Sequence, residues 1–412
     1  MPSFSIPLTG LQADSTALSN IGNNLANLNT TAFKKQTTTF EDLFYQNIGI
    51  SGNNNSLQAG VGTKVSGTSS DFSQGTLSTT SNSTDMAVQG NGFFVVDAGG
   101  VQQLTRDGNF SLSSTGGLQT ADGQSVLGYP AVGGVLNLNA PLTPINIPIG
   151  TQEAAKATSN ITLGANLDAT SATGTTGTTF SSSLTVYDSL GQSHAATVDY
   201  TKTGANTWNY AIALPAGDAT GAPVNNTGTL TFDSTGKLVS PAANVTGISF
   251  PGMVDGASNL TFQWNLYDAS GNPQISQSSG ASAVAVTNQD GFASGLYQGF
   301  SVDATGVISA QFDNGHTVQV GQVALASVTN EQGLTRLGGN NFGITSSSGE
   351  ASVGSAGLGG RGTIQDNSLE QSNVDISTEF ANLIVAQRAF EANAKTVTTF
   401  DTVTQETINI IR

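Results

Sequence analysis

The sequence has 412 residues, of which 12 are basic and 28 are acidic, so its formal net charge is −16. This charge gives no electrostatic basis for binding nucleic acid or an anionic membrane, and the absence of Cys excludes disulfides and thiolate metal sites. Only 10% of the residues are charged and 50 are Gly, whereas 37% are hydrophobic, which favours a folded, β-rich protein with many turns over a disordered chain.

The N-terminal segment, MPSFSIPLTG, has neither a basic start nor a long apolar run, so we expect no cleavable signal peptide. No stretch of the sequence approaches the roughly 18 apolar residues of a membrane span, so we expect no membrane insertion. These signals indicate either a soluble protein that stays inside the cell or one that is exported by a route that reads no cleavable leader.

A heptad pattern begins near the N-terminus. Apolar residues recur there in steps of seven, three, four and three, which predicts a helix with one apolar face. Five of the ten residues from 20 to 29 are nevertheless Asn, a poor helix former because its side chain competes for the backbone. We therefore predict that this helix gains its stability from partners and becomes ordered on assembly. The residues predicted to pack are Leu11, Leu18, Ile21, Leu25 and Leu28.

The segment after this helix carries a basic pair and a biased composition. Lys34 and Lys35 are the only adjacent basic residues, and we interpret both as solvated surface. Residues 51–75 are rich in Gly, Ser and Asn, and residues 354–362 are rich in Gly. Both stretches are interpreted as linkers.

The middle of the chain alternates with a period of two, which is typical of strands. In the segment LTFQWNL, Leu260, Phe262, Trp264 and Leu266 fall on one face, and frequent Asn-Gly and Asp-Gly pairs indicate tight turns. A Pro-rich passage at 140–150 and a change of composition near residues 281–290 delimit a segment that contains both Trp residues. We predict that this segment is a domain inserted into an outer β domain.

A second heptad pattern, with alternating steps of four and three, runs from residue 376 to residue 411. Polar residues at positions 387, 401 and 404 interrupt its apolar seam, but no Pro or Gly does. We predict one long helix that pairs with the N-terminal helix as a coiled coil and then packs against other subunits. Its predicted packing residues are Ile376, Phe380, Leu383, Phe390, Val397, Ile408 and Ile411.

The predicted fold class is therefore multidomain and mainly β, with α-helical coiled-coil termini that pair around two nested β-rich domains. The predicted division is a terminal helical domain at 1–32 and 368–412, a connector at 33–75 and 354–367, a middle β domain at 76–149 and 282–353, and an inserted outer β domain at 150–281.

Sequence motifs of catalysis are missing. No GxSxG, Walker or HExxH pattern occurs, and His194 and His316 each stand alone beside a predicted turn, which favours surface or structural roles. Some carboxylates must lie close together in a β-rich fold, so spacing alone leaves carboxylate catalysis open. We predict no catalytic, cofactor-binding or metal-binding residue and no cofactor.

Both ends of the chain resemble the flagellar axial family of rod, hook and hook-associated proteins. SNIGNNLANLNTTAFKKQ, at 19–36, is similar to the N-terminal signature of that family, and LIVAQRAFEANAKT, at 383–396, is similar to its C-terminal signature. TDMAVQGNGFFVV, at 84–96, resembles the β domain that hook and distal rod proteins share. LTVYDSLGQSHAATVDYTKTGANTWNY, at 184–210, resembles the outermost domain of hook-type members, which the shorter rod members lack.

This resemblance implies a structural subunit of the flagellar hook and no enzyme activity. The terminal helices would form an inner tube, and subunits would stack helically into a curved, flexible tube that couples rod to filament and transmits torque as a universal joint. The implied partners are copies of the chain, the rod, hook cap and hook–filament junction proteins, and the type III export apparatus. The implied location is the hook, on the extracellular side of the basal body, after export without a cleaved signal peptide.

Three other interpretations are weighed against this one. A distal rod protein of the same family would lack the inserted domain. An extracellular β-rich binding protein or glycan-active enzyme would leave both terminal heptads unexplained. The helices could also pack only within their own chain, as part of a globular core.

Overall fold

The computed structural model of the chain describes residues 4–50, 56–174 and 179–411. Contacts within the chain divide it into two compact units. Unit 1 comprises Met1–Ile149, Phe300–Ala310 and Val318–Arg412, and unit 2 comprises Gly150–Gly299 and Gln311–Thr317. Unit 2 is therefore inserted into unit 1 along the chain, while the finer division into four domains stays a prediction.

Unit 1 contains two long helices and many short strands. The helices are α1 (Ser5–Ala26) and α2 (Ile376–Ile411), and a short 3-10 helix is η1 (Glu331–Gly333). The strands of unit 1 are β1 (Gln36–Asp42), β2 (Tyr45–Ile50), β3 (Ser56–Gly60), β4 (Thr63–Ser70), β5 (Leu77–Thr79), β6 (Met86–Gln89), β7 (Phe93–Asp97), β8 (Gln102–Thr105), β9 (Phe110–Leu112), β10 (Leu118–Thr120), β11 (Ser125–Val132), β12 (Val135–Leu136), β13 (Thr143–Pro144), β28 (Leu325–Ser327), β29 (Thr335–Gly338), β30 (Asn341–Gly343), β31 (Ser352–Gly354), β32 (Thr363–Asp366) and β33 (Ser368–Glu370).

The described part of unit 2 consists of strands and turns. Its strands are β14 (Gln152–Glu153), β15 (Asn160–Asp168), β16 (Thr179–Tyr187), β17 (Ser193–Gly204), β18 (Thr207–Ala213), β19 (Thr227–Phe232), β20 (Leu238–Ser240), β21 (Val245–Phe250), β22 (Leu260–Asn265), β23 (Ile275–Ser278) and β24 (Ala283–Gln289). Three further strands run through the boundaries between the units along the chain: β25 (Gly295–Val302), β26 (Val307–Phe312) and β27 (Thr317–Val323).

Two sheets enclose the core of unit 2. One is the antiparallel meander β16-β17-β18-β19-β20, and the other has the order β21-β22-β15-β23, with β24 also paired to β15. Alternate side chains of each strand point inward, so Trp208 and Trp264 are both fully buried. Leu260, Phe262 and Leu266 are buried with Trp264, which confirms the single apolar face predicted for this segment.

The β core of unit 1 is formed around the strand order β27-β11-β7-β8-β30-β29. Phe93 of β7 and Phe342 of β30 are buried there, and Phe72 packs against both rings with centroid distances of 5.7 and 5.3 Å. Such edge-on aromatic contacts add to the burial of apolar area. The residue Phe72 follows β4, so this core also anchors the chain where it arrives from the N-terminal strands.

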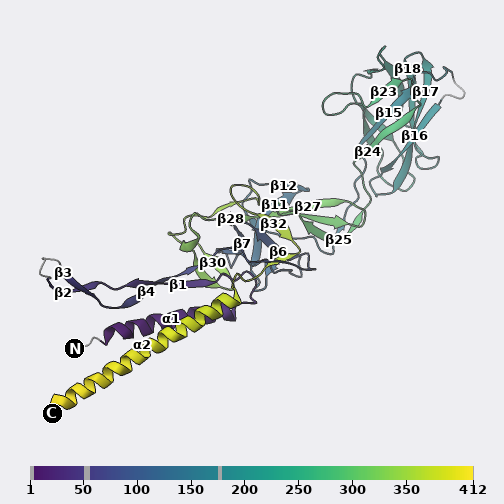
Figure 1. Cartoon of the computed structure of the whole chain (residues 1–412). Helices are drawn as coiled ribbons and strands as arrows, with labels where there is room; N and C mark the ends of the chain where they lie inside the picture. Colours follow the sequence, from purple (N-terminus) through teal and green to yellow (C-terminus); the bar gives the residue numbers. More distant parts are fainter. Residues whose placement is uncertain (1–3, 51–55, 175–178, 412) are drawn as a thin grey trace. The chain divides into compact units, whose positions relative to one another are not determined.

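The two helices of unit 1 lie side by side and antiparallel (Figure 1). Near one end the rings of Phe4 and Phe400 are 6.0 Å apart, and near the other Asn24 lies against Glu379. Asp375 caps the N-terminus of α2, because its Oδ1 accepts a 2.7 Å hydrogen bond from the backbone N–H of Thr378. The predicted fold class, mainly β with paired terminal helices, is confirmed.

The predicted linker at 51–75 is partly a folded element. Its described residues include β3 and β4; β3 pairs with β2, and β4 pairs with β1, in two antiparallel ribbons. The Thr- and Ser-rich sequence did not suggest strands because it lacks a clear apolar alternation.

Among the described residues, no helix is both long and apolar enough to cross a membrane.

Candidate assembly surface of the terminal helices

The buried residues of α1 are mostly small, and one of them, Gly10, lies close to α2. The buried residues of α1 are Pro7, Gly10, Ala13, Ala17 and Asn24. A Cβ atom added to Gly10 would lie 2.7 Å from Nδ2 of Asn393, so the helices approach closely at this point. Nδ2 of Asn393 also donates a 2.8 Å hydrogen bond to Oδ2 of Asp14. Close approach and side-chain hydrogen bonds, rather than a leucine seam, therefore hold this part of the pair together.

The predicted leucines of α1 lie beside this contact. Gly10, Ala17 and Asn24 each directly precede a predicted packing residue, and one residue corresponds to a rotation of about 100° around the helix. The predicted residues are consequently only half-buried within the chain: Leu11, Leu18, Ile21, Leu25 and Leu28.

The predicted residues of α2 divide into two groups. Leu383 and Val397 are half-buried beside α1. Four others are exposed, with Phe380 at 50%: Ile376, Phe380, Phe390 and Ile408. The side chain of Ile411 lies outside the described part of the structure. The heptad steps identified the helices, but the monomer leaves much of the predicted apolar face uncovered. That these residues pack between subunits stays a proposal.

The asparagines of α1 have a second partner that the sequence pattern did not reveal. Asn24 is 1% exposed; its Oδ1 accepts a 2.9 Å hydrogen bond from the N–H of Gln36, and its Nδ2 donates a 2.8 Å bond to the carbonyl of the same residue. Nδ2 of Asn20 donates a 2.6 Å bond to Oγ1 of Thr38. These two side chains attach strand β1 to the helix, which gives a structural role to two of the asparagines.

A groove of about 330 Å³ lies between α1, β1 and α2. Its apolar lining includes Ile21, Phe40, Val385, Ala386 and Ala389. Val385 is 68% exposed, and Phe40 is also exposed. An exposed apolar groove of this kind is typical of a surface that is covered by another chain.

Exposed apolar side chains continue along the β2–β3 ribbon and α2. Many large exposed apolar side chains are typical of a surface that other chains cover. On the ribbon they are Phe44, Tyr45, Ile48 and Leu57, and on α2 they also include Ile384, Val403 and Ile410. We refer to these residues, the groove and the exposed heptad positions together as the assembly surface.

A buried ion pair fixes the base of the helical region. Nζ of Lys34 lies 2.6 Å from Oε1 of Glu370, and both side chains are at most 1% exposed. The backbone N–H of Gly75 donates a 2.8 Å bond to the same oxygen, and Arg106 lies 3.5 Å from Oε2. Burial lowers the pKa of Lys34, an effect that the Glu370 carboxylate opposes. The interpretation of Lys34 as solvated surface was therefore wrong, because its partner lies 336 positions away; Lys35 is half-buried.

The assembly surface holds no constellation for catalysis among its described residues. The one described group that offers three metal-ligating side chains lies in unit 2 and consists of Asp188, His194 and Asp255. The expectation that His194 stands alone was wrong, since Asp188 of the same turn and Asp218 and Asp255 of other loops lie beside its ring.

Models of three flagellar families match the chain. The flagellar hook protein FlgE/F/G D1 domain matches residues 87–166, the flagellar basal body protein FlaE D2 domain matches residues 156–292, and the flagellar basal body rod FlgEFG protein C-terminal region matches residues 365–410. These matches cover parts of both units and nearly all of α2.

Full-length relatives are also similar. The chain is 34% identical to the flagellar hook protein FlgE of Escherichia coli, over 99% of both chains, and 31% identical to that of Treponema pallidum, over 98% of both. The crystal structure of Helicobacter pylori flagellar hook protein FlgE2 has the same fold, with a TM-score of 0.55 and 16% identity over 71% of this chain and all of that one. The chain therefore belongs to the flagellar hook protein FlgE family.

Proposed function

We propose that the chain polymerises helically through the assembly surface into a curved, flexible tube that couples rod to filament and transmits torque as a universal joint. As a member of its family, the chain is a structural subunit of the flagellar hook. The observation that supports assembly through the terminal helices is the large apolar area that the monomer leaves exposed on α2 and the β2–β3 ribbon. Copies related by an open helical operation would cover that area.

We infer that the helices form the inner part of the tube. The apolar side chains that α2 leaves exposed would be covered by neighbouring copies of the chain. The residues proposed to pack between copies are the half-buried and exposed heptad positions named above, together with Ile411.

The finer partners are inferred from family membership. We infer contacts with the rod, the hook cap and the hook–filament junction proteins, passage through the type III export apparatus, and a final position on the extracellular side of the basal body. We also infer that the chain has no catalytic role. A distal rod role is not favoured, because the relatives that match over nearly the whole chain are hook proteins.

The assembly surface is tested by comparing two Val→Ser variants. Val385 on α2 is 68% exposed and Val135 on β12 is 69% exposed, so the two substitutions remove equally accessible side chains. Burying a Val side chain contributes about 1.5–3 kcal/mol, and covering the exposed two-thirds of Val385 therefore contributes about 1–2 kcal/mol. Val385→Ser should raise the critical concentration for polymerisation about 5- to 30-fold.

Polymer yield is measured by sedimentation over a series of protein concentrations, with circular dichroism as a check on folding. Val135→Ser should leave the critical concentration within about twofold of the wild type. Equal effects of the two substitutions, or no effect of either, would contradict assembly through the helical groove.

A further inference from the structure

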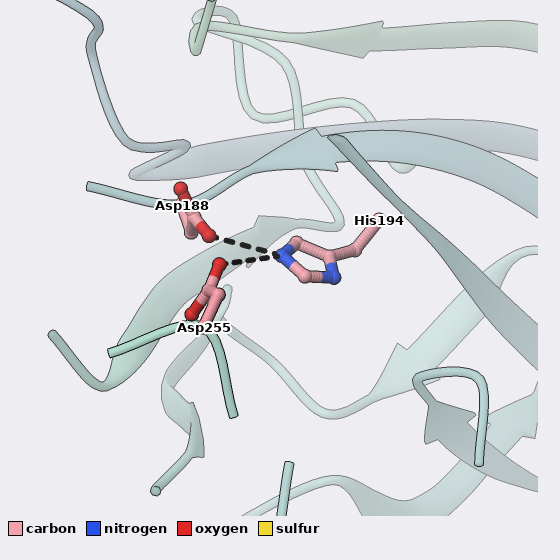
Figure 2. Close-up of side chains that lie close together, drawn as sticks. All are labelled: Asp188, His194 and Asp255. Atoms are coloured by element: carbon pink, nitrogen blue, oxygen red, sulfur yellow. Dashed lines mark hydrogen bonds and ion pairs between the residues drawn. The ribbon is translucent and has the colours of Figure 1, made fainter. Parts of the chain in front are cut away.

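His194 occupies the centre of a carboxylate cluster in unit 2. It is the second residue of β17 and is only 7% exposed. Its Nδ1 lies 2.8 Å from Oδ2 of Asp218, and its Nε2 lies 3.1 Å from Oδ2 of Asp188 and 4.0 Å from Oδ2 of Asp255. Figure 2 shows that the carboxylates of Asp188 and Asp255 face the same ring nitrogen. The assembly surface in unit 1 includes none of these residues.

The turn after β16 fixes the direction of the Asp188 side chain. Its Oδ1 accepts backbone hydrogen bonds from Leu190, at 2.8 Å, and from Gln192, at 3.0 Å. These bonds leave Oδ2 for the imidazole of His194. The carboxylate is fully buried, so its orientation is set by the fold and not by solvent.

The geometry at Nε2 leaves Asp255 without a bond to the ring. A proton on Nε2 reaches Asp188 at 3.1 Å, but Asp255 at 4.0 Å is too far away to accept a hydrogen bond, whereas an ion could contact both carboxylates. Atoms that bind one Zn²⁺ ion at about 2.0–2.2 Å lie up to about 4.4 Å from each other. The distances of 3.1 and 4.0 Å from Nε2 are both below this limit.

The hydrogen bond between Nδ1 of His194 and Asp218 orients the ring so that Nε2 can bind an ion. When Nδ1–H donates to Asp218, the neutral imidazole presents its Nε2 lone pair to Asp188 and Asp255. Histidines that bind metals are commonly oriented by a carboxylate in this way. Asp218 would therefore be a positioning residue and not a ligand.

Charge and space at the cluster are also consistent with a cation. Three carboxylates surround one imidazole, so negative charge is in excess even when the ring is protonated. A cavity of about 290 Å³ adjoins the cluster and offers room for water ligands and a route of entry. Its lining includes Gln192, His194, Asp218, Val254 and Asp255.

We propose that Asp188, His194 and Asp255 bind one divalent first-row transition-metal ion such as Zn²⁺, with Asp218 orienting the imidazole. An imidazole with two carboxylates suits these ions, whereas Mg²⁺ and Ca²⁺ favour ligand sets made of oxygen alone. The ion would join the turn after β16 and the start of β17 to the loop at 254–255. Binding to the folded state alone would raise the stability of unit 2.

The chain provides a matched control for this proposal. Its only two histidines are His194 and His316, and His316 contacts a single carboxylate, with Nδ1 2.7 Å from Oε1 of Glu153. His194→Gln and His316→Gln therefore remove one imidazole each, inside and outside the proposed site. Trp208 and Trp264, the only tryptophans, are both buried in the core of unit 2, so their fluorescence reports the unfolding of this unit.

Zn²⁺ is titrated into the full chain by calorimetry, and thermal unfolding is followed by Trp fluorescence with and without Zn²⁺. The wild type and His316→Gln should bind one ion per chain and unfold at a higher temperature when it is present. His194→Gln should lose at least 100-fold in affinity, and Asp218→Asn should lose about 10- to 100-fold. Mg²⁺ and Ca²⁺ should not compete at equal concentration.

Several results would overturn the proposal. They are the absence of saturable binding to the wild type, equal binding by the two His variants, and equal competition by Ca²⁺. If His194→Gln does not fold, Asp255→Asn decides the question, because Asp255 is partly exposed and its loss is less disruptive. A folded Asp255→Asn variant that binds Zn²⁺ as the wild type does would exclude the site.

Discussion

The asparagines of α1 allow a direct test of how strand β1 is attached to the helix. Asn24→Ala removes both hydrogen bonds to the backbone of Gln36, and each backbone group left without a partner costs about 1–3 kcal/mol. Ala is the better helix former by about 0.5 kcal/mol, which offsets a small part of this cost. Because the two bonds are only partly buried, we expect a net local destabilisation of about 2–4 kcal/mol.

Asn23→Ala is the matched control, because Asn23 is an exposed neighbour on the same helix. It should leave the local stability unchanged or slightly raised. The measurement is hydrogen exchange of the monomer, read by mass spectrometry in peptides that cover α1 and β1. Exchange in β1 should be about 30- to 900-fold faster in Asn24→Ala. Equal exchange in the two variants would refute the attachment, and the asparagines would then act only by weakening the helix.

The remaining predictions concern the helix contact, the buried ion pair and pH. Gly10→Ala should separate the helices and destabilise their pairing by about 1–3 kcal/mol, whereas Gly22→Ala, with open space around it, should stabilise α1 by about 0.5–1 kcal/mol; helical circular dichroism on heating distinguishes them. Lys34→Met should cost about 3–5 kcal/mol in chemical denaturation, because it removes the closest positive charge from a buried carboxylate, and a second change of Glu370 to Leu should not restore the loss, because it leaves the buried Arg106 without this carboxylate. Burial raises the pKa of Asp290, but hydrogen bonds from Asn160 and Ser159 lower it by more than burial raises it, so the net pKa lies below the usual value. The unfolded state then binds the proton more readily, and this contribution to stability is present above about pH 4 and is lost as the pH falls through the folded pKa. Asp290→Asn should thus flatten the acid limb of unit 2 stability, measured by Trp fluorescence, and an unchanged limb would contradict this assignment.

Sequence periodicity located the helices but could not identify their contact face. Large apolar residues and small residues both recur along α1 at heptad spacing, displaced by one position, as in Gly10 and Leu11. Hydrophobicity favours the leucines as the seam within the chain. Close approach instead selects the small residues, and this choice depends on α2, which a local pattern does not contain.

Long-range electrostatics were missed for a related reason. Lys34 was assigned to the surface because charged residues are rarely buried without a partner, and the partner Glu370 is remote in the sequence. His194 is similar, since Asp218 and Asp255 reach it from separate loops of unit 2. By contrast, the alternation around Trp264 is local, and it predicted the buried face correctly.

The distance along the chain between contacting residues has a consequence for the order of folding. Asn24 and Glu379 lie 355 positions apart, and Lys34 and Glu370 lie 336 apart. The meander β16–β20, in contrast, pairs each strand with the next one along the chain. Local pairs form quickly, whereas distant pairs first require the intervening chain to become compact. We therefore expect the β16–β20 meander of unit 2 to fold early and the helical pair to close late, so that newly arrived chains still present separate helices to the growing end of a polymer.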